Sequence, residues 1–460
     1  MRRLLVYLKD YKKESVLAPL FKLLEALFEL LVPLVMAGII DRGIAQEDMG
    51  YIAQMGLCLL ALGAVGLVSS ITAQYFAAKA AVGFATKLRQ SLFDHIQSLS
   101  FTNLDRAGTS TLITRMTSDI NQVQSGVNMV LRLFLRSPII VFGAMIMAFT
   151  IDVKSALVFA VAIPALGVVV FGIMLWTIPL YKKVQAGLDR ILGITRENLT
   201  GVRVIRAFHQ EEREKERFWE NNQALAALQM FVGKISAFMN PVTYVIVNGA
   251  IILLIYIGAI QVNVGNLTQG EVVAIVNYMS QILVELVKLA NLIITLTKAL
   301  ACADRVAAVF DITNEAPESK QRADASFESV KEPAQGRPYL SFEHVSLTYQ
   351  RAGAETLHDI HFTVNKGETI GIIGGTGSGK SSLVNLIPGF YPVTQGAVRL
   401  EGKDIREIPQ EELRGRVGMV PQKAVLFKGT IRSNLQWGKP DADEEEMWRA
   451  LELAREEGKQ

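Results

Sequence analysis

Long apolar runs are the feature that most restricts what this chain can fold into. Six stretches are each long enough to cross a bilayer, which takes about 20 mostly apolar residues. They fall at about 16–40, 51–77, 126–150, 155–180, 235–260 and 271–298. A spanning segment must satisfy its own backbone hydrogen bonds, so runs of this length predict helices. We therefore expect an all-α, six-helix transmembrane domain over 1–312.

The links between the spans are unequal in length. Those after spans one, three and five are short, whereas those after spans two and four are about 50 residues each and keep a helical pattern. We expect helices to continue outside the bilayer, turn and return. Basic residues crowd the N-terminus and the two long links, while the short links hold only Arg42 and Lys154. The positive-inside rule then predicts a multi-pass plasma-membrane protein with both termini cytoplasmic.

Charged residues inside the spans are the candidates for a site in the membrane. Lys22, Glu25 and Glu29 are spaced i, i+3 and i+7, on one face of the first helix, and Glu285 and Lys288 occur in the sixth. Such charges usually face the bundle interior or a wet cavity. One interpretation is a structural ion pair or a water-lined helix face. The other is that Glu25 or Glu29 lines a substrate cavity and contacts a cationic substrate.

A change of composition marks a second domain. Residues 313–338 are polar, contain Pro and Gly, and lack apolar periodicity, as expected of a linker. From 339 to 460 the pattern predicts a partial α/β domain. Apolar residues alternate over 339–349 with a one-residue shift, which indicates a strand with a bulge. Further strands are expected at 361–364 and, as a short buried strand, at 369–374, followed by a helix from Lys380.

A phosphate-binding loop is predicted between that buried strand and that helix. The sequence GGTGSGKSS fits the pattern GxxxxGK[ST] in its strand–loop–helix context. Its glycines let the backbone amides point at phosphate oxygens, Lys380 can reach the β- and γ-phosphates, and the Ser381 hydroxyl can bind Mg²⁺. The loop predicts a site for ATP and Mg²⁺ made of Gly374, Gly375, Thr376, Gly377, Ser378, Gly379, Lys380, Ser381 and Ser382.

With these features in place, nearly the whole chain resembles the ABC exporters. Six spans with two long cytoplasmic links, then a linker and a P-loop ATP-binding domain, match their half-transporter layout. The resemblance implies that Tyr349 stacks on adenine and that Gln422 helps Ser381 to hold Mg²⁺. It also implies short coupling helices near 101–107 and 201–208. The likeness is greatest to one subunit of the bacterial heterodimeric multidrug exporters.

The resemblance implies ATP-driven export of small amphipathic compounds or drugs from the cytoplasm. The implied partners are the lipid bilayer and a second half-transporter subunit, in a heterodimer or a homodimer. Lipid or peptide export, and a non-transporting ATP-gated channel or regulatory subunit, stay open as alternatives. A net charge of +3 without a basic, aromatic-rich patch gives no reason to expect nucleic acid.

One departure from the family pattern concerns catalysis. Nothing after Gln422 resembles the LSGGQ signature, the acidic Walker B strand with its catalytic glutamate, or the switch histidine. No catalytic residue is therefore assigned. Because phosphoryl transfer depends on positioning and charge stabilisation, we expect this chain alone to bind ATP weakly and not to hydrolyse it.

Overall fold

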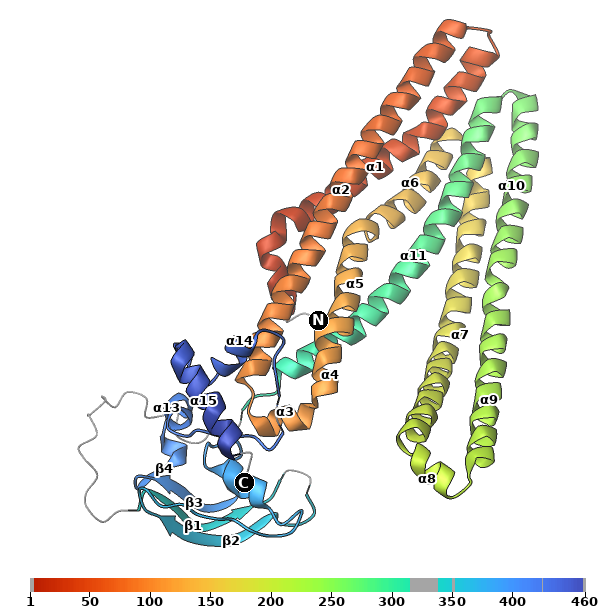
Figure 1. Cartoon of the computed structure of the whole chain (residues 1–460). Coiled ribbons are helices and arrows are strands. Elements are labelled where there is room, and N and C mark those ends of the chain that lie inside the picture. Colours follow the sequence, from red (N-terminus) through yellow and green to blue (C-terminus); the bar gives the residue numbers. More distant parts are fainter. Residues whose placement is uncertain (1–3, 315–337, 350–351, 424, 458–460) are drawn as a thin grey trace. The chain divides into compact units, whose positions relative to one another are not determined.

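Two compact units make up the structure, each with its own apolar core. The computed structural model describes residues 4–314, 338–349, 352–423 and 425–457 (Figure 1). The first unit comprises 1–99 and 103–314, and the second comprises 100–102 and 315–460. Nearly all of the predicted linker at 313–338 lies outside the described residues.

The first unit is helical throughout, as the apolar runs predicted. Its described residues form six helical segments long and apolar enough to cross a membrane. Helix α2 has 50 residues and α7 has 48, so both extend well beyond the length that a bilayer requires. The helices continue into the two long links, as predicted. The elements are η1 (Leu4–Tyr11), α1 (Lys12–Gly38), η2 (Ile39–Ile44), α2 (Met49–Ser98), α3 (Phe101–Ala107), α4 (Thr109–Thr114), η3 (Arg115–Asp119), α5 (Ile120–Leu133), α6 (Arg136–Ile151), α7 (Val153–Thr200), α8 (Val202–Ala207), α9 (Glu211–Ala237), α10 (Met239–Val264) and α11 (Gln269–Phe310).

The two ends of the membrane helices are connected differently. At one end, α2 and α7 lead into the short helices α3 and α8, at the positions expected for coupling helices (Figure 1). At the other end the helices reverse in tight turns. Asp152 alone separates α6 from α7, and its carboxylate accepts hydrogen bonds from the amide and hydroxyl of Ser155. Thr268 and Glu271 form a capping box at the start of α11.

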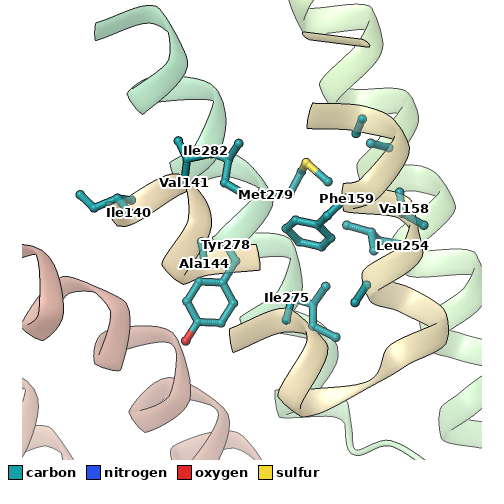
Figure 2. Packing of buried hydrophobic residues seen from close by; sticks show 14 of the residues in the cluster. Ile140, Val141, Ala144, Val158, Phe159, Leu254, Ile275, Tyr278, Met279 and Ile282 are labelled. Atoms are coloured by element: carbon teal, nitrogen blue, oxygen red, sulfur yellow. The ribbon is translucent and has the colours of Figure 1, made fainter. Parts of the chain in front are cut away.

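The main apolar core of the first unit lies around α11. Figure 2 shows Phe159 of α7 and Leu254 of α10 facing Ile275 and Met279 of α11. Tyr278 is fully buried in the same cluster, and its hydroxyl donates to the carbonyl oxygen of Leu30 in α1 at 2.6 Å. Helix α11 therefore contacts helices on several sides.

The second unit contains a four-stranded antiparallel sheet in the order β2-β1-β3-β4. In β1 the register shifts between Phe342 and Val345, and His344 between them has a φ of 48°. Phe342, Val345 and Leu347 are all buried, so the predicted bulge is confirmed. The predicted strand at 361–364 is real but begins earlier. The elements are β1 (Leu340–Leu347), β2 (Leu357–Val364), α12 (Lys380–Leu386), β3 (Gln395–Leu400), β4 (Lys403–Asp404), η5 (Ile405–Glu407), α13 (Gln410–Gly415), α14 (Ile431–Leu435) and α15 (Glu444–Glu457).

The short buried strand predicted at 369–374 is wrong, and the apolar segment at 417–421, before Gln422, is equally irregular. Both segments lack strand structure, and Ile373 and Val420 are 96% and 94% exposed. A buried strand needs neighbours that bond to its backbone and cover its faces. Within the described residues the four strands pair only with one another, so these apolar runs have no sheet to join.

Candidate functional site: a nucleotide loop and an ion cluster between membrane helices

Glycine positions shape the loop that precedes α12. Gly377 and Gly379 have φ values of 85° and 88°, in the left-handed region that glycine tolerates best. A Cβ atom at Gly374 would lie 2.8 Å from Ser378 Oγ, and one at Gly379 would lie 2.8 Å from a methyl carbon of Leu357. Side chains at these points would collide with their surroundings. Backbone amides can therefore approach an anion closely here.

Lys380 lies against the backbone of this loop. Its ammonium donates to the carbonyl oxygens of Gly374 and Gly375 at 2.9 and 2.8 Å, and to Ser378 Oγ at 3.4 Å. Leu383 and Leu386 are buried in the second unit's core and fix the helix that begins at Lys380. Ser381 is exposed in the first turn of that helix. The structure thus places the Lys380 ammonium and the exposed Ser381 hydroxyl beside the glycine loop.

Tyr349 reaches the same loop from the end of β1. Its hydroxyl donates to Ser382 Oγ at 3.0 Å, although 33 positions separate the two residues. Its ring packs edge-on against Tyr391, with centroids 5.0 Å apart and planes at 89°. The residue is half-buried, so part of its surface stays accessible. Tyr349 and the glycine loop therefore lie next to each other.

Gln422 is placed differently from the other candidate residues. It is exposed and lies in a segment without regular structure. Among the contacts of the described residues, no hydrogen bond joins its side chain to Lys380 or Ser381. Its expected role at Mg²⁺ thus rests on the family resemblance alone.

A network of ion pairs between membrane helices contains the other candidates, and its centre is Arg136. The Arg136 guanidinium donates to Glu285 Oε1 at 2.7 Å and to Glu29 Oε2 at 2.6 Å. Its Nε faces Glu25 Oε1 at 3.9 Å. We call this network the Arg136 cluster; its charged members are Lys22, Glu25, Glu29, Arg136, Glu285 and Lys288.

Further hydrogen bonds tie the Arg136 cluster to four helices. Lys22 donates to Glu25 at 2.5 Å and to Ser70 of α2 at 3.0 Å. Ser137 of α6 donates to Glu285 at 2.8 Å. The sequence pattern pointed to the charges of α1 and α11 but not to Arg136, which stands within the apolar run at 126–150. An arginine inside a membrane span was the signal that could have revealed it.

Comparisons with known proteins agree with this layout. Residues 15–286 match the family model of the ABC transporter transmembrane region, and residues 357–460 match the family model described as "ABC transporter". The chain is 33% identical to the uncharacterized ABC transporter ATP-binding protein Rv1273c of Mycobacterium tuberculosis, over 98% of this chain and 77% of that protein.

Two proteins of Bacillus subtilis are similar over comparable lengths. The uncharacterized ABC transporter ATP-binding protein YfiB is 33% identical, over 99% of this chain and 78% of its own length. The putative multidrug export ATP-binding/permease protein YgaD is 31% identical over the same shares. In such proteins the ATP-binding domain couples ATPase activity to transport, and half-transporters generally form dimers. This chain therefore belongs to the ABC transporter family, and its one membrane domain followed by one ATP-binding domain is the layout of an exporter half-transporter.

Proposed function

We propose that this chain is a subunit of an ATP-driven exporter that moves small amphipathic compounds or drugs out of the cytoplasm. The observation that carries the proposal is the presence of six membrane helices and a glycine phosphate loop in one chain. The name of its relative YgaD, which refers to putative multidrug export, supports this class of substrate.

The ATP site is proposed at the loop from Gly374 to Ser382. Loop amides that no side chain obstructs, together with the Lys380 ammonium, suit the phosphate groups of ATP. The Ser381 hydroxyl and the Gln422 side-chain oxygen are hard oxygen donors of the kind that Mg²⁺ prefers, and the ion would offset phosphate charge. Tyr349, next to Ser382, would stack on the adenine.

The proposed arrangement in the cell follows from charge and from the two domains. We place the membrane domain at 1–312 and the ATP-binding domain at 339–460, joined by the linker at 313–338. Basic residues near the N-terminus and in the two long links favour cytoplasmic termini in the plasma membrane. The partner is a second half-transporter subunit, in a heterodimer or a homodimer. ATP binding would favour the closed state of the pair, with α3 and α8 as coupling helices.

Transport by the chain together with its partner subunit tests the function. Inside-out vesicles that contain both subunits are expected to accumulate an amphipathic dye when ATP and Mg²⁺ are added. Lys380→Ala should weaken ATP binding by this subunit at least about tenfold, because one charge-assisted contact to phosphate is lost. Lys366→Ala, at an exposed lysine outside the loop, is the matched control. Dye accumulation that does not depend on ATP would refute the proposal.

A further inference from the structure

The charges of the Arg136 cluster cancel. Lys22, Arg136 and Lys288 supply three positive charges, and Glu25, Glu29 and Glu285 supply three negative ones. Each carboxylate has a cation within 4 Å. In a medium of low dielectric constant such pairing is what makes buried charges tolerable. None of the three carboxylates is thus an open cation site.

Part of the cluster is buried and part is accessible. The side chains of Arg136 and Glu285 are 8% and 3% exposed, whereas those of Glu29 and Lys288 are 39% and 40% exposed. A carboxylate and an ammonium that faced lipid would be costly. The accessible side of the cluster is therefore expected to face water or polar groups between the membrane helices. A compound that crosses the membrane domain could reach Glu29 from that side.

We propose that Arg136 is a specificity-determining residue, which neutralises Glu29 and Glu25 and so keeps the transport path from selecting cations. The inference rests on the proposed export function and specifies its substrate class: amphipathic compounds chosen by apolar surface, not by positive charge. Arg136 is suited to this role because its two terminal nitrogens already bind Glu29 and Glu285. This role differs from the interpretation, raised from the sequence, that Glu25 or Glu29 contacts a cationic substrate directly.

Removal of one positive charge should unmask a carboxylate. Arg136→Gln leaves the cluster with a net charge of −1 and frees Glu29 from its partner at 2.6 Å. Lys288→Gln also leaves the cluster with a net charge of −1, but at its accessible edge. Glu285 then keeps its hydrogen bonds from Arg136 and Ser137. The second variant loses no buried side chain and is therefore expected to fold even if Arg136→Gln does not.

Equilibrium binding to the two-subunit transporter in lipid nanodiscs, without nucleotide, tests the inference. The probes are the hydrophobic cation tetraphenylphosphonium and the neutral triphenylphosphine oxide. Arg136→Gln should bind the cation about tenfold more tightly and the neutral compound within about twofold of the unmodified protein, since only the cation gains Coulomb attraction. We compare variants by the ratio of the dissociation constant of the neutral probe to that of the cation. Lys288→Gln should raise this ratio by about threefold.

Two further variants serve as controls. Arg136→Gln combined with Glu29→Gln restores a net charge of zero and should return the ratio to that of the unmodified protein. Arg132→Gln removes a nearby arginine that forms none of the ion pairs of the cluster, and should leave the ratio unchanged.

The proposed role of Arg136 is refuted if Lys288→Gln and any folded Arg136→Gln protein keep the original ratio, or if Arg132→Gln shifts it equally. Failure of every variant to bind either probe refutes it as well. Export itself is judged separately by ATP-dependent dye uptake in vesicles. Uptake with an unchanged binding ratio would leave the exporter assignment standing and remove only the role of Arg136.

Discussion

Helix α11 is joined to α1, α6 and η3 by polar side chains, whereas the α7–α10 segment (Val153–Val264) packs against it through apolar ones. Asp41, after α1, accepts from Gly270 N at 2.7 Å, and Arg305 donates to Asp119 at 2.5 and 3.0 Å. Along α11, Glu285 of the Arg136 cluster lies between Gly270 and Arg305. For the described residues, no side-chain hydrogen bond or ion pair joins the α7–α10 segment to the other helices.

This difference indicates which part of the membrane domain can shift. Ion pairs and hydrogen bonds need particular distances and angles, so they fix the position of one helix against another. Apolar contacts such as Phe159 with its neighbours in α11 have no such directional requirement. We therefore expect α1, α2, α5, α6 and α11 to move as one body, and the α7–α10 segment to slide or tilt against it.

Loss of a buried carboxylate from the Arg136 cluster should have the largest effect. Glu285→Ala leaves Arg136 with a partly unpaired charge in a buried site, which is expected to lower the free energy of unfolding by about 3–5 kcal/mol. Thermal unfolding in nanodiscs measures the change. Lys288→Ala removes a partner at the accessible edge and should cost less than about 1 kcal/mol. Equal costs for the two variants would contradict the distinction between buried and accessible members.

Shortening of the Phe159 side chain, which packs α7 against α11, should loosen the α7–α10 segment but not the other membrane helices. Phe159 is fully buried, and Phe159→Ala is expected to cost about 3 kcal/mol through lost packing. Spin labels on α10 and α11 should report a broader distance distribution, while labels on α6 and α11 should not. Val161→Ala, at an exposed position in the same helix, is the control. Equal broadening for both label pairs would argue against two separately moving parts.

Close approach of α11 to α1 should be sensitive to a single methyl group. A Cβ atom at Gly270 would overlap the backbone of Ala37 and would lie 2.6 Å from Asp41 Oδ2. Gly270→Ala is therefore expected to destabilise the fold by about 1–2 kcal/mol, because backbone atoms cannot move aside easily. Gly63→Ala in α2 meets nothing within 4 Å and should be neutral or slightly stabilising. Chemical unfolding of both variants would reveal whether the two behave alike.

The smallest effect is expected at a single hydrogen bond. Tyr278→Phe removes the bond to the carbonyl oxygen of Leu30 and keeps the buried ring. Interhelical hydrogen bonds of this kind contribute about 0.6 kcal/mol in membrane proteins. Hydrogen exchange of the α1 amides should increase slightly near Leu30. Tyr256→Phe, at an exposed position in α10, should change nothing; a similar increase there would mean that the hydroxyl bond is not the cause.

The sequence predicted the membrane helices well because apolar length is a property of each segment alone. The ion pair between Arg136 and Glu285 could not be predicted in this way. The two residues are 149 positions apart and meet only after α6 packs on α11. The bulge at His344 was visible as a shift in alternation, since local burial decides it. The strand predicted at 369–374 failed because a strand also depends on neighbours that its own residues cannot specify.

The lengths of α2 and α7 have a mechanical consequence. At a rise of about 1.5 Å per residue, helices of 50 and 48 residues are about 75 and 72 Å long. Such a helix acts as a lever: a tilt of about 5° around its middle displaces each end by about 3 Å. Small tilts of α2 and α7 would thus become displacements of about 3 Å at α3 and α8. Such displacements need no bending of the helices, provided that the middle of each helix keeps its position while the helix tilts.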